Sequence, residues 1–241
     1  MQIRAIRTTN QAMGKKKPQT RKWHLRLLQI ADSGYPTGAF GHSQGLEYAI
    51  RKDWIRSRED LMMWVEDALR HTLIPLDGRA CLKSWRNTLG FNQRKWIELN
   101  REVTAMRPSL EQRQASFETG LSLWENAIVS FDLDLPSLEE EVFIQWPVVW
   151  GRICNILDIP VKETVETLLL GAIRGWAHVA MRIIPLGQRD SYRFLADCAK
   201  LLEAGEWDWD DEAAKPLESL SPGLDIAQMG HQNLHARSFR S

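Results

Sequence analysis

The chain has 241 residues and a mass of 27.8 kDa, which suits one large domain or two small ones and allows a substantial buried core. Its 31 Lys and Arg residues balance 31 Asp and Glu residues, so the net charge favours neither a nucleic-acid partner nor an acidic one. Leucine (29) far outnumbers valine (9) and threonine (10), which favours helices over sheet because unbranched side chains keep more rotamer freedom on a helix.

Membrane-spanning and secreted classes do not fit this sequence. The longest uncharged stretch covers 14 residues (33–46) and is rich in glycine, whereas a spanning helix needs about 20 apolar residues. No apolar segment follows the early basic residues, so no secretory signal is expected. Cys81, Cys154 and Cys198 are too scattered for a metal-binding pair or a disulfide framework. We therefore expect a cytoplasmic protein with three reduced thiols and no membrane contact.

The N-terminal segment is strongly basic. Residues 1–31 contain eight Lys and Arg residues and no Asp or Glu, and residues up to about 20 show no apolar periodicity. We predict a mobile basic arm over residues 1–20. A solvated tail is the favoured interpretation, and nucleic-acid binding is not expected because no aromatic residue interleaves with the lysines.

Helical periodicity begins near Arg21 and recurs along the chain. Ser57 and Asp60 form a capping-box pattern ahead of an apolar helix that we expect Pro75 to end. Further helices are predicted by the same criteria, with a break at Pro136 and with Pro147 in a first turn. They cover residues 78–89, 93–106, 109–131, 148–157 and 191–205.

The longest apolar pattern runs from Val161 to Ile184, and it is apolar on most sides. Such a helix usually lies at the centre of a core, so we expect Trp176 to be buried there. Gly171 and Gly175 are spaced to let another helix approach closely. No segment shows convincing strand alternation, and the sequence predicts an all-α domain of about eight to ten helices over residues 21–215.

One motif suggests hydrolytic chemistry. Gly41-His42-Ser43-Gln44-Gly45 matches the G-x-S-x-G nucleophile elbow, in which glycines relieve crowding as a strand turns into a helix. Pro36 and Gly38 precede it, however, and no parallel sheet is expected. A serine hydrolase centred on Ser43 is therefore the alternative hypothesis, and a glycine-rich helix entry is the favoured one.

Other candidate sites are weak. No Lys follows the glycines of residues 34–45, so no phosphate-binding loop is predicted. The acidic run 207–212 is interpreted as a solvated loop, although it offers oxygen ligands. His231 and His235 have the spacing of a helical zinc pair, but a partner-contact or capping role is favoured. We predict no cofactor, no resident metal and no catalytic residue.

Four ordered motifs carry a family resemblance. Residues 27–47 read LLQIADSGYPTGAFGHSQGLE, residues 104–120 read TAMRPSLEQRQASFETG, residues 182–190 read RIIPLGQRD, and the chain ends LDIAQMGHQNLHARSFRS. Over residues 21–241 the chain resembles the urease accessory protein F (UreF) family. The resemblance implies an all-α, non-enzymatic factor, commonly dimeric, that binds the accessory protein UreD (UreH). It also implies recruitment of the GTPase UreG, so that nickel reaches the urease apoprotein as GTP is hydrolysed.

The resemblance also implies where partners bind. In the family the C-terminal tail becomes ordered against UreD, and residues 216–241 of this chain have the Pro and Gly punctuation and apolar-plus-arginine end suited to folding on binding. We therefore expect residues 225–241 to be mobile in the free chain. The predicted partner-binding residues are Tyr35, Pro36, Phe40, Arg182, Gln188, Asp225, His231, His235, Arg237, Phe239 and Arg240.

Several positions depart from the family pattern. Ser191 and Tyr192 replace a second Gly-Gln pair, and four tail positions differ from the residues usual there, which lowers the charge and aromatic content of the tail. The tail positions are Gly230, Gln232, His235 and Ser238. These changes indicate either a looser tail or a partner that differs to match.

Overall fold

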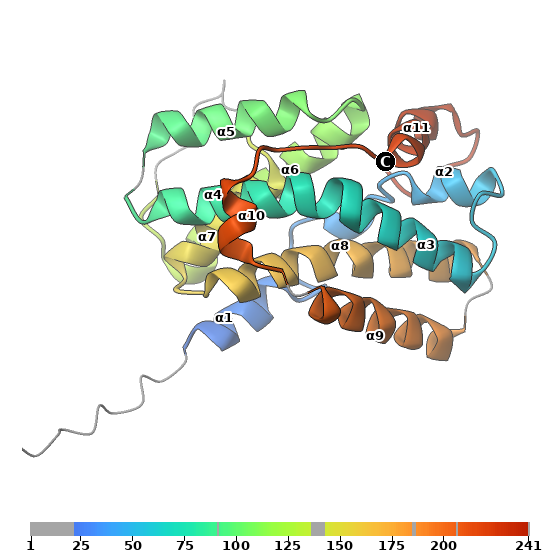
Figure 1. The fold of residues 1–241 in the computed structure, drawn as a ribbon, viewed down its shortest axis with the longest axis horizontal. Helices are drawn as coiled ribbons and strands as arrows, with labels where there is room; N and C mark the ends of the chain where they lie inside the picture. Colours follow the sequence, from blue (N-terminus) through green and yellow to red (C-terminus); the bar gives the residue numbers. More distant parts are fainter. Residues whose placement is uncertain (1–21, 91, 136–142, 185–186, 206, 241) are drawn as a thin grey trace, which may run out of the picture.

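A computed structural model describes residues 22–90, 92–135, 143–184, 187–205 and 207–240. The predicted basic arm and the predicted break at Pro136 lie outside these residues. The described part is helical and contains no strand, which confirms the all-α prediction (Figure 1). None of its helices is both long enough and apolar enough to cross a membrane. The α-helices are α1 (Trp23–Ile30), α2 (Leu46–Arg51), α3 (Arg58–Ala68), α4 (Arg79–Thr88), α5 (Gln93–Ala105), α6 (Leu110–Phe131), α7 (Trp146–Ile156), α8 (Val161–Ile183), α9 (Gln188–Ala204), α10 (Trp209–Ala214) and α11 (Pro222–Gly230).

A long continuous rod crosses the molecule, made of α3, a π-helical segment at Leu69–Gly78 (η2) and α4 (Figure 1). Its start is the predicted capping box, since Ser57 and Asp60 each accept the other's backbone amide. The prediction that Pro75 ends the helix is wrong, because Pro75 lies inside the π-helical segment. The wider π-helical turn accommodates a residue that has no amide to donate.

The C-terminal part of the chain supplies the bonds that Pro75 leaves unmade. In an α-helix the carbonyl of His71 would accept the amide that Pro75 lacks, and here it accepts from the Leu220 amide at 2.7 Å. The Pro75 carbonyl accepts from the Glu218 amide at 3.3 Å. The rod is therefore completed by residues 216–221, the segment between α10 and α11, about 145 residues further along the chain; we call this segment the strap.

Helix α7 lies between α4 and α6 and is buried from Pro147 to Cys154. It starts with Pro147 in its first turn, as predicted. A Cβ built on Gly151 would overlap the carbonyl oxygen of Cys81, so glycine allows the backbones of α4 and α7 to touch. A close contact between helices therefore lies at Gly151, which the sequence analysis did not single out.

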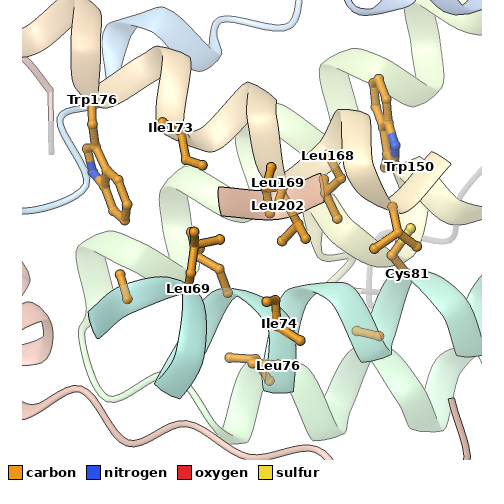
Figure 2. Packing of buried hydrophobic residues seen from close by; sticks show 14 of the residues in the cluster. Leu69, Ile74, Leu76, Cys81, Trp150, Leu168, Leu169, Ile173, Trp176 and Leu202 are labelled. Carbon is orange, nitrogen blue, oxygen red and sulfur yellow. The ribbon is translucent and has the colours of Figure 1, made fainter. Parts of the chain in front are cut away.

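Helix α8 runs through the core, and Trp176 on it is 1% exposed, both as predicted. Figure 2 shows Leu168, Leu169 and Ile173 of α8 facing Leu69 and Ile74 of η2. The expected helix contact at Gly171 and Gly175 is wrong, because neither glycine has any atom within 4 Å of a built Cβ. These two glycines lie on the half-buried stripe of α8, which borders a cavity instead of a helix.

The prediction of a solvated loop for the acidic run at 207–212 is also wrong, because most of the run forms α10, which packs on α4. Asp208 caps this helix by accepting the amides of Asp210 and Asp211. The buried guanidinium of Arg79 donates to Glu212 and Glu218, each at 2.9 Å. Arg79 thereby fastens both α10 and the strap to α4, and these carboxylates are structural partners.

Candidate partner-binding region

The loop before α2 folds over α6 and α8. Tyr35 is buried and its hydroxyl donates to Ser130 Oγ at 3.3 Å. Pro36 is exposed, and its carbonyl accepts from Asn126 of α6 at 3.0 Å. Gly38 has a φ of 74°, a left-handed conformation that favours glycine. The half-buried Phe40 ring meets His178 of α8 edge to face at 5.6 Å. These contacts hold the loop against α6 and α8 and leave Pro36 exposed.

A buried carboxylate follows this loop. Glu47 lies in the first turn of α2 with its side chain fully enclosed. Arg51, one turn later, donates from Nε and Nη2 to Glu47 Oε1 at 3.2 and 3.1 Å. Burial alone would raise the pKa of Glu47, but its hydrogen bonds outweigh burial and hold the pKa below its ordinary value. Glu47 is therefore ionised inside the fold.

The C-terminal segment supplies the other donors to Glu47. His231 Nε2 lies 3.1 Å from Glu47 Oε2. The Ser238 amide donates to Oε1 at 2.8 Å, and the Phe239 amide donates to Oε2 at 3.2 Å. The carboxylate thus joins the start of α2 to the end of the chain.

Residues 225–240 are folded against the body in this structure, and the mobility expected for residues 225–241 in the free chain stays a prediction. Helix α11 buries Leu224, Ala227 and Gln228 and packs on α2 and α6. Its contact with α2 is close, since a Cβ on Gly45 would lie 2.9 Å from the Gln228 amide nitrogen. Beyond α11, the Arg240 amide donates to the Gly41 carbonyl at 2.8 Å. Leu224 of the segment is buried, and Glu47 of the body accepts hydrogen bonds from the segment. The segment therefore has a docking site within its own chain, which the composition of the tail does not reveal.

The end of α8 meets the same segment. Phe239 is 6% exposed, and the guanidinium of Arg182 lies 5.6 Å from the centre of its ring. Arg182 is itself exposed, so it covers the buried ring from the solvent side. Arg182 therefore joins the last turn of α8 to the C-terminal segment.

The structure separates the predicted partner-binding residues into three groups by their burial. Tyr35, His231 and Phe239 are buried within the chain, so any effect on a partner would be through the surfaces they hold in place. Phe40 and Asp225 are half-buried. The remaining residues have exposed side chains, namely Pro36, Arg182, Gln188, His235, Arg237 and Arg240.

Proximity within the exposed group is uneven. Arg182 and Arg240 belong to the cluster around Phe239 and Gly41, and His235 lies beside Arg51 and Ile183. Gln188 lies at the start of α9, and the half-buried Asp225 lies in α11. Burial raises the pKa of Asp225.

A cavity of about 130 Å³ borders this region. Its walls come from the loop (Phe40, His42), from α6 (Thr119) and from the half-buried stripe of α8 (Gly171, Gly175). Gln228 of α11 completes the wall next to Gly45. Burial lowers the pKa of His42, and the nearby Glu118 partly opposes that shift. The C-terminal segment is therefore part of the cavity wall as well as a surface feature.

The serine-hydrolase alternative finds no support in this geometry. Ser43 is fully buried, and its hydroxyl has no hydrogen-bond partner among the described residues. His231, a candidate base, is bonded to Glu47. A nucleophile needs both access to substrate and a base within hydrogen-bond reach, and Ser43 has neither here. In the described ranges no three His, Cys, Asp or Glu side chains gather as a metal site.

Comparison with known proteins adds a family. A family model described as UreF matches residues 55–199, which is more than half of the chain. The chain belongs to the UreF family. Proteins named urease accessory protein UreF are similar along nearly the whole chain. One from Paenarthrobacter aurescens is 30% identical over 235 residues, covering 91% of this chain and 98% of that protein. Others from Azoarcus sp. and Bacillus sp. are 28% and 27% identical and each cover 90% of this chain.

Membership of the UreF family confirms the resemblance seen in the four motifs. The structure, by contrast, singles out residues that sequence reasoning missed, above all Glu47, Arg51 and His42. One signal was present, because Glu47 is an acidic residue inside the apolar run from Leu46 to Ile50. A carboxylate in such a run requires donors, but the sequence does not say which ones.

Proposed function

We propose that this UreF-family protein is a non-enzymatic scaffold for urease maturation, which binds UreD (UreH) and recruits the GTPase UreG for nickel delivery to the urease apoprotein. The observation that carries the proposal is the exposed arginine surface of the docked C-terminal segment. Arg237 and Arg240 have exposed side chains, on either side of the buried Phe239. The backbone beneath them is fixed by Glu47 and Gly41.

An ordered arginine surface is a suitable protein-binding surface. Arginine is enriched in the residues that contribute most to protein–protein affinity, and preorganisation lowers the entropic cost of binding. The full set of proposed partner-contact residues is Pro36, Phe40, Arg182, Gln188, Asp225, His235, Arg237 and Arg240, with Tyr35, His231 and Phe239 holding them in position. The proposal includes a homodimer within the complex and a cytoplasmic location, which fits three free, buried cysteines.

The test is a pull-down of UreD by the full chain carrying Arg237→Ala and Arg240→Ala. The matched control carries Arg94→Ala and Arg101→Ala, which remove two exposed arginines from α5. We expect the tail variant to lose at least about tenfold in UreD affinity, and the control to bind normally. Equal binding by both variants would show that the tail arginines are not the contact.

Deleting residues 225–241 would be a poorer test of UreD binding by the tail, because the deletion would cut through α11 and remove the buried Ala227 and Gln228. Point variants keep these packing contacts. Recruitment of UreG gives a second measurement: we expect negligible GTP binding by this chain alone, and UreG association only when UreD is present. UreG binding of equal strength with and without UreD would contradict the ordered assembly.

Gln188 tests whether the region after α8 takes part in recruitment. Because its side chain is exposed at the start of α9, Gln188→Ala should leave the melting temperature unchanged. If Gln188 contacts UreG, the same variant in the preformed complex with UreD should recruit UreG more weakly. A lower melting temperature with normal recruitment would instead assign it a purely structural role.

A further inference from the structure

Glu47 accepts hydrogen bonds from its own helix and from the distant C-terminal segment. Four groups donate to its two oxygens: the Arg51 guanidinium, the His231 ring and the amides of Ser238 and Phe239. Three of these lie 184 to 192 residues away in sequence. A buried carboxylate is stable only when such donors surround it.

We propose that Glu47 is a latch residue, whose ionised carboxylate holds residues 231–240 in their docked conformation so that this segment docks and releases as one unit. His231 lies at one end of the segment and Phe239 lies at the other, and both reach the same carboxylate oxygen, Oε2. The shared acceptor couples the two ends, because loss of the carboxylate leaves donors at both ends unsatisfied in the interior.

The helical body does not depend on the latch in the same way. Leu46 and Ala49 anchor α2 in the core, and α2 packs on α8 independently of the tail. Helix α11 has its own buried residues, Leu224 and Ala227. Release of residues 231–240 would return Glu47 to water beside Arg51, and α2, α8 and α11 would remain in place.

The docked segment has a buried side and an exposed side. Phe239 points into the core while Arg237 and Arg240 remain exposed, and the Arg240 amide is bonded to Gly41. Glu47 bonds the two amides between these arginines and so determines which way each side chain faces. It therefore positions the arginine surface without being part of that surface, a consequence for binding that rests on the proposed function.

Hydrogen exchange on the full-length protein tests the latch without any partner. Glu47→Gln keeps the size of the side chain but replaces an acceptor oxygen by an NH₂ donor. We expect the amides of Ser238, Phe239 and Arg240 to exchange roughly 10- to 100-fold faster in this variant. Amides of α8 should keep their protection. Glu98→Gln, the same change at the exposed Arg94–Glu98 pair of α5, should leave all of these amides unaffected.

Unchanged protection of the three tail amides in Glu47→Gln would overturn the proposal. If Glu47→Gln does not fold, Ser238→Pro decides the question, because it removes one donor to Glu47 from an exposed position. The latch predicts faster exchange at Phe239 and Arg240 in that variant as well. Full protection of both amides in Ser238→Pro would equally overturn the proposal.

The UreD pull-down separates this inference from the proposed function. Faster tail exchange together with weaker UreD binding supports both. Faster tail exchange with normal UreD binding retains the latch and contradicts the tail as the UreD contact. Unchanged exchange contradicts the latch whatever the binding result.

Discussion

Individual glycines are tightly constrained where the C-terminal segment meets the rest of the chain. Gly45 shows the constraint most directly, because it combines a φ of 84° with a close approach to the backbone of α11. Gly38, only seven residues earlier, has a φ of 74° but no atom within 4 Å of a built Cβ. Both positions have a left-handed backbone that glycine adopts without cost, and they differ in crowding.

Gly45→Ala should therefore destabilise the protein more than Gly38→Ala. A left-handed backbone costs a non-glycine residue about 1 kcal/mol, so each variant should lose about this much free energy of unfolding. At Gly45 the new methyl group also meets the Gln228 amide nitrogen at 2.9 Å, so we expect a total loss of roughly 2 to 3 kcal/mol. Urea denaturation of the two variants measures the difference, and equal losses would show that α11 moves aside freely.

Between elements, the spacing of helices depends on which glycines face a neighbour. Gly151 of α7 touches the backbone of α4 at Cys81, whereas Gly171 of α8 faces the cavity. Both glycines occupy helix interiors and look alike in sequence. Their neighbours give them opposite roles.

Alanine at these two positions should change stability in opposite directions. Gly151→Ala forces α4 and α7 apart and should cost at least about 2 kcal/mol. Gly171→Ala meets no atom within 4 Å and should gain up to about 1 kcal/mol from helix propensity. Thermal unfolding of both variants provides the measurement. A loss of stability in Gly171→Ala would mean that other atoms contact the half-buried stripe of α8 in solution.

Over the whole molecule, carboxylates join the C-terminal part to the helical body. Glu47 bonds residues 231–239, and Glu212 of α10 bonds Arg79 of α4. Burial raises the pKa of each, but hydrogen bonds outweigh burial and leave both pKa values below the ordinary 4.5. A depressed folded-state pKa contributes stability above the unfolded pKa, and that stability is lost as the pH falls through the folded value. The pKa of Asp77, within η2, shifts in the opposite direction, because burial raises it above 3.8.

Acid should therefore loosen the C-terminal part before the body. We expect the protection of residues 209–240, corrected for intrinsic exchange, to be constant from pH 7 to about 5 and to fall below about pH 4.5. Protection of α8 should persist to lower pH, since its core contacts do not involve these carboxylates. Hydrogen exchange at several pH values tests this, and Glu212→Gln should remove the pH response of α10. Simultaneous loss in α8 and the C-terminal part would contradict it.

The sequence by itself determined the helical class, most of the helix positions and the family. Helices follow from periodicity, caps and prolines within about 20 neighbouring residues, as at Ser57, Pro147 and α8. The family followed from four motifs in order along the chain, and the match to the UreF family model confirms it.

Only the tertiary structure decided which distant groups meet. Pro75 lies within a helical rod because the Leu220 amide donates to the His71 carbonyl. Residues 231–240 dock on the body because they donate hydrogen bonds to Glu47, which is 184 residues from His231 in sequence. Gly151 and Gly171 differ only in what stands opposite them. Local pattern determines backbone propensity, but a buried polar group or a glycine acquires its role from its partner, and that partner is brought near by the packing of the whole core.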